Sequence, residues 1–231
     1  AEFPAIKVAR MDVDAVKGKT AHDSLIKLFE EHRIDILVGT QMVVKGLDFV
    51  KVGLVGILDA DGLLSFADFR VNERAFQLME QVSGRAGRKD IQGKVLVQTS
   101  QPGHPVLQFV QQHDYIKMYQ YELDKRKEYF YPPFSRIIII TLKHKVKEVV
   151  DEAAHRLAAA LQKELQQLVV GPAAPVIGRV RNQYLMELMI KLPLDMKMIQ
   201  QYKQIIRNHF NLLVAETTFK TVWMIADVDA Q

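Results

Sequence analysis

Two arginines in the short segment QVSGRAGR, residues 81–88, have the spacing of a phosphate-binding pair. Arg85 and Arg88 are three positions apart, so they share one face of a helical turn. Each planar guanidinium can hold a phosphate with paired hydrogen bonds. The simpler interpretation is a solvated helix start. A nucleotide site would in addition need a loop that holds the phosphates.

The only segment that approaches a phosphate-binding loop is VDAVKGKTAH, residues 13–22. Such a loop needs the pattern G-x-x-x-x-G-K-[ST], in which two glycines let backbone N–H groups surround the phosphates. Gly18-Lys19-Thr20 supplies the second half, but Val13 stands where the first glycine is required. We therefore expect a turn that leads into a helix, and no phosphate loop in this chain.

A second candidate site is GTQMVVKGLDF, residues 39–49. Thr40 and Gln41 lie where an apolar strand ends, which is where open α/β sheets bind ligands. Thr40 offers a hydroxyl and a backbone N–H to phosphate. Lys45 adds a positive charge, and Gly46 lets the backbone approach a ligand closely. Asp48 can accept a hydrogen bond from a ribose hydroxyl. Individually, these residues are more typical of a solvated loop.

The elements that position these residues alternate along the first half of the chain. Short, β-branched runs predict strands at 34–39, 54–58 and 94–98, and their continuous apolar character fits a sheet buried on both faces. Apolar residues at helical spacing predict helices over 21–32 and 73–81. This alternation indicates an α/β layer with a parallel sheet and flanking helices.

A charged, aromatic-flanked helix is predicted over 117–131, where Pro132-Pro133 ends it. We place the domain boundary there, which gives a domain at 1–116, a connecting helix and a domain at 132–231. In the second domain, the pattern predicts the order β-α-β-β-α-β, a small α+β split-βαβ sandwich with both helices on one face. Its clearest segments are strands at 136–145, 182–192 and 221–228 and helices at 147–168 and 195–213, with Asp195 as an N-cap.

The charge is unevenly distributed along the chain. Residues 1–131 carry 18 Lys and Arg against 18 Asp and Glu, whereas residues 132–231 carry 13 against 9. A basic second part suggests a polyanionic partner, although a slightly basic surface without a partner is the simpler explanation. No apolar run approaches 18 residues, so no membrane span is expected. The chain has no cysteine, which fits the cytosol.

Taken together, the two candidate sites resemble a known family. The order G-T-Q-M-x-x-K-G-x-D-F followed by Q-x-x-G-R-x-G-R is similar to motifs V and VI of superfamily 2 helicases, and in particular of the primosomal replication-restart helicases. Further similar segments are residues 58–88, QTSQPGHPV at 98–106, Pro-Pro-Phe at 132–134, GPAAPVIGRVRNQY at 171–184 and the terminal ADVDA. The resemblance runs almost from end to end.

The resemblance implies why no phosphate loop is present. In that family, the phosphate loop and the Asp-Glu box lie in a first RecA-like lobe that precedes this sequence, and a zinc-binding insertion falls just before RMDVDA. The chain is then expected to hold the second RecA-like lobe and the C-terminal domain of a longer protein. Ala1, in place of Met, agrees with a cut chain.

The resemblance also implies roles for the residues. Arg85 and Arg88 would reach the nucleotide phosphates, with Arg88 as the arginine finger, and Gln81 would position the attacking water. Gly46 and Asp48 would lie near the nucleotide. The residues implied on the DNA side are Thr40, Gln41 and Lys45.

In the second domain, Arg179 and Arg181 precede a predicted strand that contains Tyr184. The family is usually richer in arginine here and carries an Arg after the Tyr, where this chain has Leu185. Tyr184 can stack on a base, although a strand Tyr more often packs against a core. Lys143, Lys145 and Lys147 are explained by solvation of a strand end. Asp59 and Asp61 are interpreted as a polar turn, and no metal site is predicted.

We therefore expect a fragment of an ATP-dependent 3′-to-5′ DNA helicase that restarts replication at stalled forks in the bacterial cytoplasm. ATP and Mg²⁺ would be shared with the first lobe, and zinc would be bound elsewhere in the full-length protein. Expected partners are forked and single-stranded DNA, single-strand-binding protein and primosome proteins, and we expect a monomer. The alternatives are another superfamily 2 translocase and a non-catalytic nucleic-acid or protein-docking module.

Overall fold

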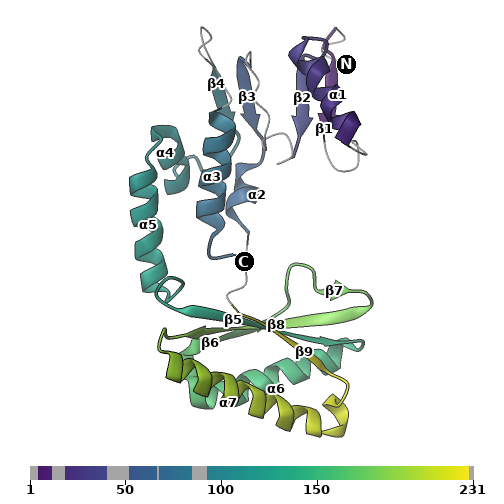
Figure 1. Ribbon diagram of the computed structural model, residues 1–231, viewed down its shortest axis with the longest axis vertical. Helices are drawn as coiled ribbons and strands as arrows, with labels where there is room; N and C mark the ends of the chain where they lie inside the picture. Colours follow the sequence, from purple (N-terminus) through teal and green to yellow (C-terminus); the bar gives the residue numbers. More distant parts are fainter. Residues whose placement is uncertain (1–4, 12–18, 41–51, 67, 85–92, 229–231) are drawn as a thin grey trace. The chain divides into compact units, whose positions relative to one another are not determined.

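The computed structural model describes residues 5–11, 19–40, 52–66, 68–84 and 93–228 (Figure 1). The chain divides into two compact units, Ala1–Gln120 and Tyr121–Gln231. The division falls within one helix, whereas the sequence analysis placed it at Pro132-Pro133. Within the described part of the chain, no helix combines the length and the apolar character needed to cross a membrane.

The first unit contains four short parallel strands. β1 (Val8–Met11) pairs with β2 (Ile36–Gly39), and β3 (Leu54–Ile57) pairs with β4 (Lys94–Val97). Three of these strands and their parallel pairing confirm the sequence prediction, and β1 was missed. Over the residues that the structure describes, the strands form two separate pairs.

The expectation that these strands are buried on both faces is wrong. Ile57 is buried, and Val95 and Val97 pack against the helical core on the same face. The alternate residues Leu54 and Leu96 point to the other face and are 57% and 60% exposed. A continuous apolar run could not reveal this difference, because strand side chains alternate between faces whatever covers them.

In the described residues, five helices accompany the strands, and the last of them continues into the second unit. They are α1 (Lys19–Glu30), α2 (Ala60–Leu64), α3 (Val71–Ser83), α4 (Pro105–Gln112) and α5 (Tyr115–Glu128). α1, α3 and α5 confirm the predicted helices to within a few residues, whereas α2 and α4 were not predicted. The core of this unit places Phe76 and Met79 of α3 against Val106, Val110 and Met118.

A partly buried carboxylate fastens the start of α3. Asp68 accepts hydrogen bonds from the Arg70 backbone N–H at 2.9 Å and from the Arg70 guanidinium at 3.2 Å, and Arg74 lies 2.8 Å from its second oxygen. Burial alone would raise the pKa of Asp68, but the hydrogen bonds and charges of the two arginines outweigh it and hold that pKa below its ordinary value. Asp68 thus ties Arg70, which precedes the helix, to Arg74 in its first turn.

The second unit is a split-βαβ sandwich, as predicted. Its sheet has the order β6-β8-β5-β9, with β5 (Arg136–His144) and β8 (Gln183–Leu192) at the centre and β6 (Val169–Ala173) and β9 (Trp223–Val228) outside. All of these neighbours are antiparallel. A short strand, β7 (Arg179–Val180), pairs with the start of β8. The predicted order has one strand between α6 and β8, which β6 supplies, but its bounds were not predicted because prolines and glycines interrupt this part of the sequence. β7 was not predicted.

Two long helices cover one face of this sheet, as Figure 1 shows: α6 (Lys147–Leu165) and α7 (Met196–Ala215). The side chains that meet them alternate along the central strands, so that Ile138, Ile140 and Leu142 are almost fully buried. Asp195 is the N-cap of α7, as predicted, and its carboxylate accepts from the backbone N–H groups of Lys197 and Met198 at 2.9 Å.

On the other face of the sheet, Lys191 fastens the segment that follows α5. Its Nζ donates a 2.7 Å hydrogen bond to the Tyr129 carbonyl and lies 3.7 Å from the centre of the Tyr131 ring. Burial lowers the pKa of Lys191. The ammonium group therefore links β8 to a segment about sixty residues earlier in the chain.

We expect Asp68→Asn to lower the free energy of unfolding at pH 7 by about 1–3 kcal/mol, because it weakens hydrogen bonds between charged groups. The folded-state pKa of Asp68 is depressed, so this stabilisation is present above the ordinary carboxyl pKa of about 4 and is lost as the pH falls through the folded-state value. Urea denaturation at pH 7 and pH 3 measures both effects. Asp23→Asn, at an exposed carboxylate on α1, is the control. Equal stability of Asp68→Asn and the parent at pH 7 would contradict the prediction.

Candidate nucleotide and nucleic-acid sites

In the first unit, polar side chains join the carboxyl ends of β3 and β4. Asp61 accepts a 2.5 Å hydrogen bond from the Thr99 hydroxyl and a 2.7 Å hydrogen bond from the Ser100 backbone N–H. These hydrogen bonds from Ser100 and Thr99 lower the pKa of Asp61. Asp59 caps α2 by accepting from the Gly62 N–H at 3.1 Å. Asp59 and Asp61 therefore form the polar turn that the sequence analysis favoured.

α3 positions Gln81 at its last turn. Met79 is fully buried, whereas Gln81, two positions later, is exposed. Glu80 holds this turn against the end of α4, since its carboxylate lies 3.0 Å from His113 Nδ1. Among the residues that the structure describes, nothing hydrogen-bonds the Gln81 amide.

Most of the residues implied in nucleotide or DNA binding by the first unit lie outside the described part of the chain. These are Gln41, Lys45, Gly46, Asp48, Arg85 and Arg88. Thr40 is described: it directly follows β2 and is exposed, as expected for a residue at a strand end. Thr40 and Gln81 are the described residues among those implied in DNA and nucleotide binding by this unit, and both have exposed side chains. Thr40 follows a strand, and Gln81 lies in the last turn of a helix.

The three residues implied in DNA binding by the second unit lie together in the β7–β8 hairpin. Arg179 is in register with Tyr184, and its guanidinium lies 4.8 Å from the centre of the Tyr184 ring. Arg179 also donates a hydrogen bond to Asn182. Arg181 and Asn182 form the two-residue turn, both with positive φ, as a type I′ turn requires. Arg181 is therefore exposed at the tip, whereas Arg179 is held on the aromatic ring.

Tyr184 also takes part in packing. Its ring is partly buried against the core of the second unit, while Arg179 occupies part of the ring. The packing interpretation of Tyr184 thus agrees with the structure, and base stacking stays a prediction. A base that stacked on Tyr184 would have to share the ring with Arg179.

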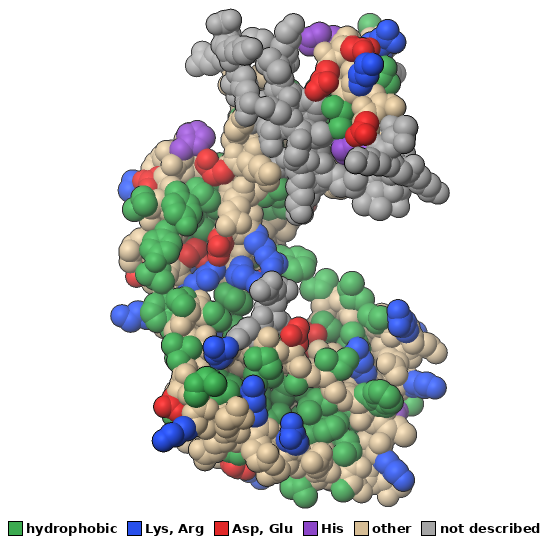
Figure 2. Space-filling model, viewed as in Figure 1, with side chains coloured by type: hydrophobic (Ala, Val, Ile, Leu, Met, Phe, Trp, Pro, Cys, Tyr) green, Lys and Arg blue, Asp and Glu red, His purple; other side chains and the backbone are tan. Residues whose placement is uncertain are grey.

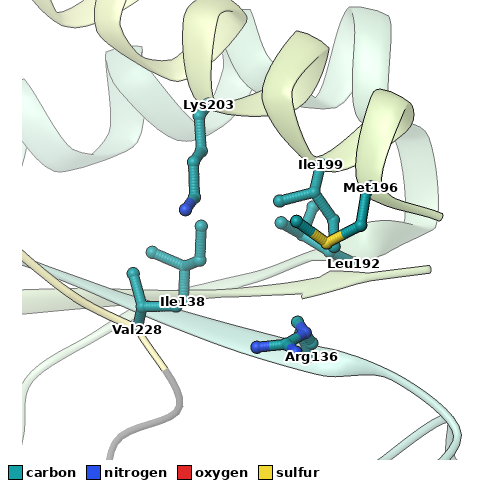
Figure 3. Close-up of a pocket in the computed structure, with 7 residues that line it drawn as sticks. All are labelled: Arg136, Ile138, Leu192, Met196, Ile199, Lys203 and Val228. Atoms are coloured by element: carbon teal, nitrogen blue, oxygen red, sulfur yellow. The ribbon is translucent and has the colours of Figure 1, made fainter. Parts of the chain in front are cut away.

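A pocket in the second unit was not anticipated. It lies between the start of β5, the end of β8, the first turns of α7 and the end of β9, as Figure 3 shows. Apolar side chains form most of its walls, and Arg136 and Lys203 add positive charge; the remaining lining residues are Ile138, Leu192, Met196, Ile199 and Val228. Its volume of about 80 Å³ is far below the roughly 300–1,000 Å³ of sites that hold whole small molecules. It suits a single side chain.

Two sequence profiles of known protein families match different parts of the chain. The sequence profile of the helicase conserved C-terminal domain matches residues 3–90. The profile of the primosomal protein N C-terminal domain matches residues 127–231. The two profiles together account for most of the chain and support the prediction of a helicase lobe with an α/β fold in its first part.

Individual relatives agree over nearly the whole chain. Replication restart protein PriA of Bacillus subtilis is 40% identical over 211 residues, which is 90% of this chain and 26% of the relative. The protein of the same name from Synechocystis is 39% identical over 88% of this chain and 25% of the relative. The corresponding protein of Chlamydia pneumoniae is 34% identical over 98% of this chain and 30% of the relative. The chain spans a quarter to a third of the length of these relatives, and it belongs to the PriA family of replication restart proteins.

Proposed function

We propose that this chain is the part of an ATP-dependent 3′-to-5′ DNA helicase that supplies the second RecA-like lobe and the C-terminal domain during replication restart. The observation that carries the proposal is the presence, in one chain, of a helicase C-terminal domain at 3–90 and a primosomal protein N C-terminal domain at 127–231. The second domain separates this proposal from other superfamily 2 translocases.

In the proposed mechanism, a first lobe holds ATP and Mg²⁺, and this chain supplies groups to the same nucleotide. Bound Mg²⁺ would neutralise phosphate charge. Arg85 and Arg88 would donate to phosphate oxygens, with Arg88 stabilising the charge that develops on the transferring phosphoryl group. Gln81 would orient the attacking water, and its exposed amide at the end of α3 fits this role. Gly46 and Asp48 would contact the nucleotide.

Several partners follow from the same proposal. Forked and single-stranded DNA would contact Thr40, Gln41 and Lys45 in the first unit and the Arg179–Tyr184 hairpin in the second. Single-strand-binding protein and primosome proteins would bind the longer protein in the bacterial cytoplasm. Zinc would be held outside this chain, and we expect the chain to be a monomer.

We expect the isolated chain to show no turnover of ATP, because its sequence has no G-x-x-x-x-G-K-[ST] loop to hold the phosphates. Phosphate release with ATP, Mg²⁺ and single-stranded DNA measures this directly. Arg88→Ala is the matched control and should be indistinguishable from the parent. Turnover by the parent that disappears in Arg88→Ala would contradict the prediction, since it would place a complete site within this chain.

We expect forked DNA to bind the chain with an affinity that falls steeply with salt. Fluorescence anisotropy of labelled DNA across a salt series gives the slope of log K against log salt concentration. Each phosphate contact contributes about 0.7–0.9 to this slope, so Arg179→Ala/Arg181→Ala should flatten it by up to about 2. Lys163→Ala/Arg207→Ala, which removes two exposed cations from the helices, should leave the slope unchanged. No binding at low salt would refute a DNA-binding role.

A second candidate function, docking of an acidic protein tail, is favoured by the pocket beside α7. We infer that a peptide with one large apolar side chain among carboxylates suits this pocket, because Arg136 and Lys203 flank an apolar cavity (Figure 3). Single-strand-binding protein is among the partners expected from the sequence, and an acidic tail on such a partner would suit this pocket.

The variant Lys203→Glu tests this docking function. We expect it to weaken binding of a labelled acidic peptide by about 3- to 10-fold, because it reverses one charge beside the pocket. Lys163→Glu, an equal charge reversal on α6, should leave the affinity unchanged, and anisotropy measures both. Identical effects of the two variants would indicate a general charge effect and would exclude the pocket as the binding site.

A further inference from the structure

The sheet of the second unit has one face that α6 and α7 do not cover. Because strand side chains alternate, the residues between the core positions point to this face. On β5 and β8, two of these residues, Lys143 and Leu185, face each other in register. On β9, the corresponding residues are Trp223 and Ile225, which are 71% and 48% exposed.

Trp223 lies beside a lysine at one end of this face. It is the partner of Lys143 in the β5–β9 register, so indole and ammonium extend from adjacent strands on the same side of the sheet. The two acidic side chains of the face lie further along the strands. The Glu187 carboxylate accepts a hydrogen bond from the Thr141 hydroxyl, and Asp227 is the register partner of Ile139 on β5. The Trp223 end of the face is thus apolar and positive.

More cations gather at this end of the unit. β5 ends here and β9 begins here, as the 3.0 Å contact between His144 Nε2 and the Thr221 hydroxyl shows. The cations on the neighbouring turns and strand ends are Lys145, Lys147, Arg179, Arg181 and Lys220. In the described residues, none of them forms an ion pair with a carboxylate. Figure 2 shows Lys and Arg side chains along this edge of the second unit, and Glu148 is the nearby acidic residue in the first turn of α6.

We propose that Trp223 is a stacking platform for an unpaired base of single-stranded DNA, with Lys143 as a contact to the adjacent phosphate. The proposal rests on the proposed DNA-binding function and names a site for it. An exposed indole offers a flat π-face to any base, and surrounding cations follow the phosphate backbone. An acidic peptide would bind less tightly here. The apolar pocket that could hold its side chain lies at the opposite ends of β5 and β9.

The protein carries its own probe for this site. Trp223 is the single tryptophan of the chain, so the intrinsic tryptophan fluorescence reports on this side chain alone. We expect an oligo(dT) of twelve nucleotides to quench this fluorescence in a saturable titration. An abasic oligomer of equal length carries the same phosphates without bases, and it should bind more weakly and leave the emission nearly unchanged.

Substitutions measure the contribution of the stack by anisotropy of labelled oligo(dT). Trp223→Ala should weaken binding by about 5- to 150-fold, the range measured for removing one base–aromatic stack, whereas Trp223→Phe should recover most of the affinity. Trp223 is mostly exposed, so these changes should not unfold the unit, and circular dichroism checks this. Lys143→Ala should weaken binding, and Lys163→Ala on α6 is its matched control.

The possible outcomes separate the two proposals. Oligo(dT) binding by anisotropy, with unchanged tryptophan emission and full affinity in Trp223→Ala, would overturn the stacking site and leave DNA binding by the chain intact. No binding in either measurement would overturn both. Quenching by an acidic peptide but not by oligo(dT) would assign this face to a protein partner, and it would likewise overturn the proposal.

Discussion

The register between β5 and β8 determines which way each side chain of the C-terminal sheet points. The two strands pair over nine residues, so that Ile138 faces Ile190 and Ile140 faces Leu188 on the side of the helices. A slip of one residue would turn every one of these side chains to the opposite face. The same register sends Lys143 and Leu185 away from the helices. The register between β5 and β8 therefore determines both which side chains form the core of this unit and which are on its other face.

The first unit is organised differently, because its strands are only four residues long. Short strands hold few ladder hydrogen bonds, and polar side chains make the remaining links. Asp61 joins the ends of β3 and β4, and Asp68 fixes the start of α3. The helix that carries Gln81 is thus fixed at its start by a charged cluster and along its length by Phe76 and Met79 in the core.

The sequence predicted the parts of the fold that have a clear period. The long helices α6 and α7, the central strands and the Asp195 cap follow from local patterns alone. The bounds of β6 escaped prediction because Gly171 and Pro172 break the strand pattern, and the two-residue strand β7 is too short to show one. Gly171 has a φ of +102°, and a side chain there would lie 3.0 Å from the Glu187 carbonyl. The pocket beside α7 and the Trp223 surface could not be predicted either, because residues far apart in sequence meet there only after folding.

The Lys191 contacts indicate where the C-terminal unit must begin if it is to be produced separately. The ammonium group of Lys191 rests between the Tyr129 carbonyl and the Tyr131 ring, both of which precede Pro132. A truncated protein that started at Pro132 would remove both partners and leave a partly buried charge on β8 without compensation. Dissection of the two units should therefore cut near Tyr121, within α5, although the prolines mark the more conspicuous boundary in the sequence.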